Sequence, residues 1–344
     1  MHVPDGFLNA PTSVATGAVA AACIAVALRK AREELDERTA PLAGLTAAFV
    51  FAGQMINFPV GIGTSGHLMG GALAAVLVGP WTAVLVLSVV LMVQSLLFAD
   101  GGLTALGTNI TLIGITTVVA GWLVTRAVLA LLPKRPGSVV PAAALGAFVS
   151  VPVAAAVFVV LFAAGGEANL PFGPLLATML GWHLLIGIGE ALITGLTVSA
   201  VVAVRPDLVY AARGLRPALQ LRQADGTLIP APAGPGPSAS GTPRASLRGL
   251  LIGGGLMAAL IAGALSFLAS ASPDGLERVA ESEGFADSAR EHTFGNFSLA
   301  EYGEIGGIPV GLAGLVGVVI TAGIAVVVFR FVRRRAARQQ NVST

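Results

Sequence analysis

Long apolar stretches separated by short polar ones recur along most of the 344-residue chain. Several stretches reach the roughly 20 residues that an α-helix needs to cross the hydrocarbon core of a bilayer. The pattern predicts nine helices, over residues 12–28, 41–58, 67–79, 81–98, 106–131, 138–164, 176–203, 249–270 and 309–332. The third stretch is the shortest and meets the fourth at Gly79-Pro80, so we expect the helix count to hold to within one.

The composition strengthens this interpretation. Hydrophobic residues make up 55% of the chain and charged residues 11%, whereas soluble proteins carry roughly 25% charged residues. The 44 glycines and 20 prolines are typical of packed transmembrane helices. We therefore predict an all-α polytopic membrane protein and exclude a soluble enzyme, a collagen and a disordered chain. The single cysteine, Cys23, excludes an internal disulfide framework and a cysteine-rich metal site.

The distribution of charge predicts the orientation of the chain. Of the 20 lysines and arginines, 18 fall in segments that the helix order puts on one side, and the other two, Arg278 and Arg290, share the segment before the last helix with eight acids. The positive-inside rule then puts Met1 and this acidic segment outside the cell and the C-terminus inside. The first helix is not expected to be a cleaved signal, because Arg29, Lys30 and Arg32 follow its apolar run rather than precede it.

Residues 223–247 are rich in Pro, Gly, Ala and Ser, a composition that predicts a flexible linker. The expected organisation is a bundle of about seven helices over 1–205, a cytoplasmic linker over 206–248, and a two-helix module over 249–335. We interpret the acidic segment of that module chiefly as solvated, although it could also gather cations. The tripeptide Pro-Asp-Gly occurs at 4–6 and 273–275, and is read only as a common turn former.

The first residues, MHVPDGFL, carry candidate metal chemistry. The terminal amine of Met1, the amide nitrogen of His2 and a ring nitrogen of His2 could close two fused chelate rings on one ion. We expect Met1 to be retained, because the peptidase that removes it generally requires a small second residue. A planar set of nitrogens suits Ni(II), Cu(II) or low-spin Co(II) better than zinc or magnesium. The alternative is that His2 is merely an exposed second residue.

A second histidine, His67, lies in the glycine-rich sequence GIGTSGHLMGG at residues 61–71, on the same predicted outer side. The glycines would permit close backbone approach, so that a folded-in N-terminus could use His67 as a fourth nitrogen ligand. The alternative is a hydrogen-bonded structural histidine. His292, in the acidic segment, is a lone histidine and is not expected to be a ligand. Four polar residues are candidates for orienting an imidazole or lining the pocket: Gln54, Asn57, Thr64 and Ser65.

Further polar residues lie within or beside the apolar stretches. His183 and Glu190 share a helix face but are separated by ~10.5 Å along the axis, so they cannot both bind one ion directly. Glu190 near mid-membrane is either functional or a protonated structural residue. His183 either supports the metal pocket or is a satisfied buried imidazole. Asp100 and Asn109 flank the outer turn after the fourth helix and are candidate pocket residues.

Known catalytic motifs are absent from the sequence. It has no Gly-x-x-x-x-Gly-Lys-Ser/Thr phosphate loop, no His-Glu-x-x-His and no Gly-x-Ser-x-Gly. The chain is therefore not expected to be its own ATPase, and energy, if it is used, comes from elsewhere. Two other classes stay open: a membrane metalloenzyme with an open site at the histidines, and a structural subunit in which His2 has no role. The metalloenzyme is disfavoured, because four nitrogen ligands leave no position for water or substrate.

Several motifs carry a resemblance to a known family: MHVPDGF at the start, QMINFPV (54–60), GTSGHLMGGALAAVLVGPW (63–81), LLFADGGLTALGTNI (96–110) and GWHLLIGIGEALIT (181–194). Over roughly 1–205 the chain resembles the CbiM/NikM family, the cobalt/nickel substrate-binding membrane component of energy-coupling-factor (ECF) transporters. SPDGLERVAE at 272–281 resembles the PDGLE-type CbiN/NikN companion, fused here over about 249–335.

The resemblance implies a substrate-capture subunit without its own ATPase. Co(II) or Ni(II) would be the transported substrate, with no organic cofactor, and its ligands would be the Met1 amine, the His2 amide and ring, and His67. The implied partners are a membrane coupling (T) subunit and cytoplasmic ABC-type ATPases, with no nucleic acid. The implied location is the cytoplasmic membrane of a prokaryote, and the N-type module would assist metal loading.

Overall fold

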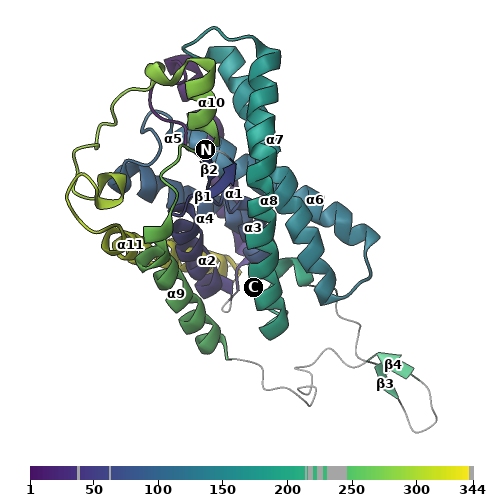
Figure 1. Ribbon diagram of the computed structural model, residues 1–344. Helices are drawn as coiled ribbons and strands as arrows, with labels where there is room; N and C mark the ends of the chain where they lie inside the picture. Colours follow the sequence, from purple (N-terminus) through teal and green to yellow (C-terminus); the bar gives the residue numbers. More distant parts are fainter. Residues whose placement is uncertain are drawn as a thin grey trace.

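The computed structural model describes residues 1–36, 39–61, 63–213, 215, 220–222, 228–230 and 246–340. Most of its regular structure is helical (Figure 1). The α-helices are α1 (Ala10–Glu34), α2 (Thr39–Gln54), α3 (Gly71–Val78), α4 (Pro80–Val93), α5 (Leu106–Asn109), α6 (Thr117–Leu131), α7 (Val139–Gly165), α8 (Phe172–Val204), α9 (Leu247–Gly263), α10 (Gly275–Glu283) and α11 (Val310–Gln340). Two antiparallel pairs complete it, β1 (Phe58–Gly61) with β2 (Thr64–Gly66) and β3 (Gln220–Arg222) with β4 (Leu228–Pro230).

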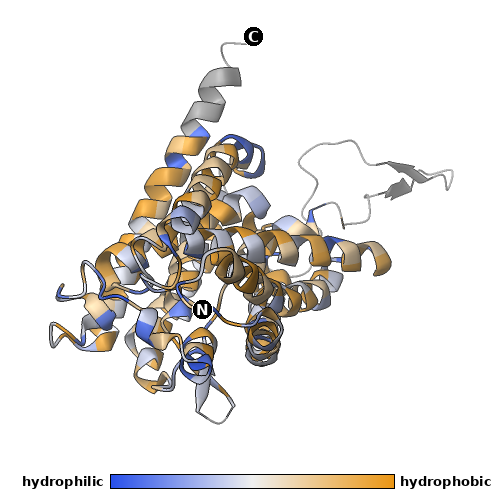
Figure 2. Ribbon diagram, turned by 90° about the horizontal axis from the view of Figure 1, so that it is seen from above, coloured by the Kyte–Doolittle hydropathy of each residue, from blue (hydrophilic) through white to orange (hydrophobic). Residues whose placement is uncertain are grey.

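Six helical segments of the described chain are long and apolar enough to cross a membrane: Ala10–Glu34, Pro80–Phe98, Leu106–Leu131, Pro136–Gly165, Phe172–Val204 and Val310–Arg333. Their outer faces expose large apolar side chains, such as Val14 (72% exposed), Leu131 (85%) and Leu196 (72%), and the ribbon is largely apolar around its periphery (Figure 2). Apolar surface on this scale fits lipid rather than water. The prediction of an all-α polytopic membrane protein is confirmed.

The C-terminal helices pack directly on the N-terminal part of the chain, chiefly on α2. Both α9 and α11 contact α2, while α7 lies between α6 and α8 (Figure 1). The connection between α9 and α11 contains α10, which contacts α8 and β2. The two predicted modules are therefore packed against each other. Helix α10 lies at the same end of the bundle as the N-terminus (Figure 1).

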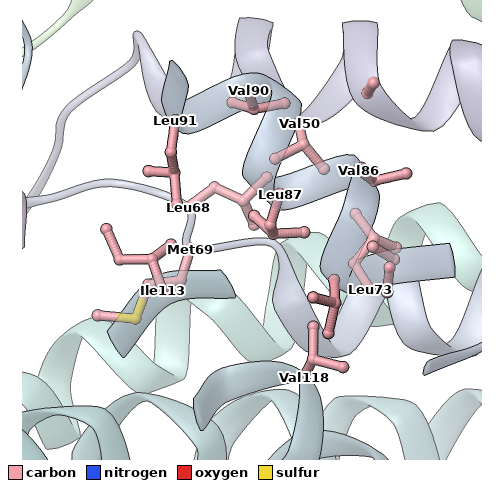
Figure 3. Packing of buried hydrophobic residues seen from close by; sticks show 14 of the residues in the cluster. Val50, Leu68, Met69, Leu73, Val86, Leu87, Val90, Leu91, Ile113 and Val118 are labelled. Carbon is pink, nitrogen blue, oxygen red and sulfur yellow. The ribbon is translucent and has the colours of Figure 1, made fainter. Parts of the chain in front are cut away.

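The third predicted helix is shorter than expected. Residues 67–70 are not helical, and α3 covers only Gly71–Val78, because Gly70 has a left-handed backbone (φ 80°). The carboxylate of Glu190 accepts the amide hydrogens of Met69 and Gly70, so these donors are satisfied outside a helix. The short helix is nevertheless central. Leu68, Met69 and Leu73 pack with apolar residues of α2, α4 and the segment from residue 110 to α6 (Figure 3).

Two other segments differ in detail from the sequence prediction. The second predicted helix, 41–58, ends at Gln54, and strand β1 begins at Phe58. The acidic segment, interpreted as solvated, contains helix α10. Most of the predicted linker 206–248 lies outside the described residues; the β3–β4 pair falls within it.

Candidate metal centre

Residues 1–9, the N-terminal strap, fold back onto the bundle. The peptide of Val3 is held on both sides: its N–H donates to Asn109 Oδ1 (2.8 Å), and its carbonyl accepts from Asn109 Nδ2 (3.0 Å) and from Gly102 N (2.9 Å). Further along, the Asp5 carboxylate accepts from Leu103 N (3.0 Å) and Thr104 N (2.7 Å). Through these hydrogen bonds the strap is bound to the segment after α4. This segment lies between two π-helical stretches, Gln94–Phe98 and Ile110–Thr116.

Glycines permit this close approach. A Cβ on Gly102 would lie 2.2 Å from Asp5 N, and one on Gly6, whose φ is +93°, would lie 2.2 Å from Ser288 O. A side chain at either position would displace the strap from its contacts. The glycines at position 6 and at positions 101–102 therefore have a steric cause.

The strap brings the terminal amine of Met1 against His67. The amine contacts His67 Nε2 and donates to Asp274 Oδ2 at 2.6 Å, and the Met1 residue is 2% exposed. The other ring nitrogen of His67, Nδ1, lies 3.0 Å from the carbonyl oxygen of Leu68. Because a carbonyl only accepts hydrogen bonds, Nδ1 carries the hydrogen and Nε2 presents its lone pair to the amine. This tautomer is the one in which Nε2 can bind a metal ion.

The ring of His2 stacks on the ring of His67, with centroids 4.7 Å apart and planes 10° apart. His2 Nδ1 lies 3.0 Å from Asp100 Oδ1, and Asp100 Oδ2 accepts from the Tyr302 hydroxyl at 2.5 Å. His2 Nε2 is buried without a hydrogen-bond partner among the described residues. For Nδ1 to enter a chelate with the Met1 amine, it would have to exchange Asp100 for the metal.

The electrostatics of the centre favour a neutral imidazole between carboxylates. Burial lowers the pKa of His67, and the N-terminal ammonium beside it lowers that pKa further. Burial by itself would raise the pKa of Asp274, but the charge of the terminal amine outweighs burial and holds this pKa well below its usual range. Burial would also raise the pKa of Asp100. The contacts with His2 and with the Tyr302 hydroxyl outweigh burial and lower this pKa.

A cavity of about 380 Å³ opens beside these groups. The residues that line it include His2, His67, Asp100, Asp274, Glu277 and Glu301. Burial, followed by the charges of nearby carboxylates, raises the pKa of Glu301 to about 7. Among the described residues no group of three His, Cys, Asp or Glu side chains is arranged to hold a metal ion. The predicted ligand set, which includes the Met1 amine and the His2 amide, does not depend on such a group.

The polar residues of the β1–β2 region have other partners than an imidazole. Ser65 Oγ donates to the carbonyl of Ser272 (2.7 Å), and the Thr64 hydroxyl has no partner within the described part of the chain. Asn57 lines the cavity, and its carbonyl accepts from Ser270 N (2.7 Å). Gln54 donates to the carbonyl of Met69 (2.9 Å) and so supports the turn after His67.

His183 and Glu190 lie one behind the other on α8, below the centre. Fully buried His183 places Nδ1 2.7 Å from the Met179 carbonyl, while its Nε2 has no described partner. Glu190 accepts from Met69 N (2.7 Å) and Gly70 N (2.8 Å), directly after His67 and Leu68. Glu190 therefore supports the backbone that carries the His67 imidazole.

Replacing Glu190 with Gln tests this support. We expect Glu190→Gln to destabilise the protein by about 1–3 kcal/mol, since the amide NH2 of Gln would confront one of the two backbone donors. Thermal unfolding in detergent measures the effect. Thr194→Val is the matched control, one turn further along α8, because the buried Thr194 hydroxyl has no partner among the described residues. Equal unfolding temperatures for the two variants would contradict the assigned role.

Sequence reasoning missed three residues of the centre: Asp5, Asp274 and Tyr302. Asp274 caps α10, with the Glu277 side chain returning to its backbone, a reciprocal capping box. The spacing Asp-x-x-Glu resembles the Ser/Thr-x-x-Glu signal and was readable in the sequence. The contact with Met1, 273 residues away, was not. Tyr302 had no local signal; it has a left-handed backbone (φ 52°) and reaches Asp100 from the segment before α11.

Fold and site together define a multi-pass membrane protein with a buried cluster of nitrogen and carboxylate groups at one end of its helices. The family model for the cobalt uptake substrate-specific transmembrane region, CbiM, matches residues 2–208, and the PDGLE domain matches residues 248–334. The chain belongs to the CbiM family and is fused to a PDGLE module, as the resemblance in its motifs indicated.

Individual relatives agree with this assignment. The chain is 42% identical over 131 residues to the fused nickel transport protein NikMN of Rhodobacter capsulatus, covering 38% of this chain and 37% of that one. It is 33% identical over 217 residues to the cobalt transport protein CbiM of Geobacter sulfurreducens, covering 61% of each. A crystal structure of a transition metal transporter superposes with a TM-score of 0.53 at 31% identity, covering 59% of this chain and 93% of that one.

Proposed function

We propose that this protein captures Co(II) or Ni(II) on the outer side of a prokaryotic cytoplasmic membrane for uptake. The metal would be bound by the Met1 amine, the His2 amide and ring, and His67 Nε2. The contact of the terminal amine with the Nε2 lone pair of His67, both buried, is the observation that carries the proposal. An amine nitrogen and an imidazole nitrogen in direct contact are a pair of ligands suited to these ions.

The surroundings support the same function. Asp274 and Asp100 lie next to the nitrogen donors, so negative charge is available to offset a buried divalent ion. The cavity beside them offers a route for a cation to the donors. The names of the relatives, cobalt and nickel transport proteins, support the choice of substrate.

Orientation and partners belong to the same proposal. The strap precedes α1, and the basic residues around Arg32 follow at the far end of that helix, which supports an outer N-terminus and an inner C-terminus. The sequence contains no phosphate loop. We therefore assign energy coupling to separate chains, a membrane T subunit and cytoplasmic ABC-type ATPases.

Metal content tests the proposal. The full chain with Met1 at its start, purified in detergent and incubated separately with Co(II), Ni(II), Zn(II) and Mg(II), is expected to retain close to one equivalent of Co(II) or Ni(II) after gel filtration. Planar nitrogen donors should disfavour Zn(II), which favours a tetrahedral arrangement, and Mg(II), which prefers oxygen ligands. Inductively coupled plasma mass spectrometry measures the content. Retention of none of the four ions, or of Mg(II) alone, would overturn the proposal.

A further inference from the structure

We propose that Asp274 is a positioning residue for the terminal amine: its carboxylate holds the Met1 amine against His67 in the empty site and keeps holding it after metal binds. This inference rests on the proposed function of the site. It gives a role to a residue of the C-terminal module that is not one of the proposed ligands.

The two oxygens of Asp274 have separate partners. Oδ1 accepts from the first backbone amides of α10, Leu276 N at 2.7 Å and Glu277 N at 3.0 Å. Oδ2 accepts from Met1 N at 2.6 Å. Because the helix cap fixes the carboxylate through Oδ1, the direction of Oδ2 is fixed as well. The start of α10 thereby sets the position of the amine.

Two hydrogen bonds connect the segment before α10 to strand β2, which directly precedes His67. Ser65 N donates to the carbonyl of Pro273 (2.9 Å), and Ser65 Oγ donates to the carbonyl of Ser272 (2.7 Å). Ser65 lies two residues before His67, and Pro273 one residue before Asp274. The His67 Nε2 and Asp274 Oδ2 atoms lie 3.7 Å apart, with the amine in contact with both. These hydrogen bonds therefore keep His67 Nε2 and Asp274 Oδ2, the two acceptors of the amine, at a defined separation.

Burial makes this ion pair decisive for the first residues of the strap. The side chain of Met1 is fully buried, and that of Asp274 is 10% exposed. Leaving the ammonium buried without its carboxylate is strongly unfavourable. The next attachments are the contact of His2 Nδ1 with Asp100 Oδ1 (3.0 Å) and the hydrogen bonds between Val3 and Asn109, which hold the strap from residue 2 onward. Loss of the Asp274 charge should therefore release the Met1 amine while the strap from His2 onward stays bound.

The same carboxylate remains useful once metal is bound. An amine that binds a metal loses one proton and retains two N–H bonds. The metal takes the direction toward His67, and one remaining N–H still points at Asp274 Oδ2. Asp274 therefore prepares the amine for the ion without competing for the lone pair that the ion uses.

The reactivity of the α-amine in the metal-free protein tests the inference. The full chain in detergent is treated with an amine-acylating reagent, and modification of the N-terminal peptide is followed by mass spectrometry. We expect Asp274→Asn to react about tenfold faster than the wild type, because a hydrogen bond between charged groups is lost. Asn is as good a helix N-cap as Asp, so α10 should be preserved.

Two matched variants separate the Asp274 carboxylate from the general charge of its segment. Glu281→Gln removes an exposed acid from α10 itself and leaves the capping box and the Asp274 carboxylate in place. Asp287→Asn removes an exposed acid from the same segment. Both should react at the wild-type rate. The dissociation constant for Co(II) should rise about tenfold in Asp274→Asn and stay unchanged in the two controls.

Either of two outcomes would overturn the inference: a wild-type labelling rate in Asp274→Asn, or equal acceleration in Glu281→Gln. If Asp274→Asn does not fold, the wild type still decides, because its amine must react far more slowly than that of the urea-unfolded chain. The labelling needs no metal. Failure of the proposed function, which is a wild type that retains neither Co(II) nor Ni(II), is thus a distinct result.

Discussion

A chain with one alanine placed before Met1 is expected to lose Co(II) and Ni(II) binding and to keep its helical fold. The extra residue converts the Met1 amine into an amide, which no longer presents an amine lone pair to the ion. It also moves the new terminal amine by ~3.8 Å, one residue along the chain. Met1 is 2% exposed, so the added residue would have to be accommodated inside the folded chain.

Metal content by mass spectrometry, compared with circular dichroism for helix content, measures this effect. The matched control carries one alanine after Thr344, which lengthens the chain equally without touching the amine. We expect about one equivalent of metal in the control and none in the N-terminal extension. Undiminished metal in the extended chain would show that the free amine is not a ligand.

Replacement of His67 by Ala is expected to have the next largest effect. It removes the only side-chain nitrogen that the described structure places in contact with the Met1 amine. Loss of an outer partner of a metal ligand costs roughly 10–100-fold in affinity, and loss of a ligand should cost more. We therefore expect the dissociation constant for Co(II) or Ni(II) to rise by more than about 100-fold, measured by competition with a coloured chelator.

His292→Ala is the control for this experiment. His292 also lines the cavity, but its Nδ1 accepts from Phe294 N at 3.0 Å, and no ion pair or contact joins it to Met1, His2 or His67 in the described residues. Its replacement should change the affinity less than twofold. Equal losses in the two variants would indicate that the ion binds in the cavity rather than between the amine and His67.

The sequence predicted the helical membrane fold because the signal is local. A helix in lipid needs an unbroken apolar stretch, and each such stretch can be recognised in the sequence without reference to the rest of the chain. The proximity of Met1 and His67 could also be anticipated, since charge asymmetry put both on one side. Their contact is observed; their role as metal ligands stays a prediction.

Asp274 shows where sequence reasoning stopped. Pro273-Asp274-Gly275 was interpreted as a turn, and the acids that follow as a solvated segment. The structure instead buries Asp274 and uses one carboxylate for two purposes, a helix cap and an ion pair. Glu190 shows the same limit. Its place within a span was readable, but its two backbone partners after His67 depend on how α8 packs.

The amino-acid sequence by itself determined that this chain crosses a membrane several times and that its first two residues and His67 carry nitrogen donors for one compartment. Only the tertiary structure decided which carboxylates meet them, Asp274 at the amine and Asp100 at the His2 ring. The reason is physical. Apolar patterning acts within a single helix, whereas these ion pairs join residues about a hundred or more positions apart, and only the packing of α10, β2 and the strap brings them within hydrogen-bonding distance.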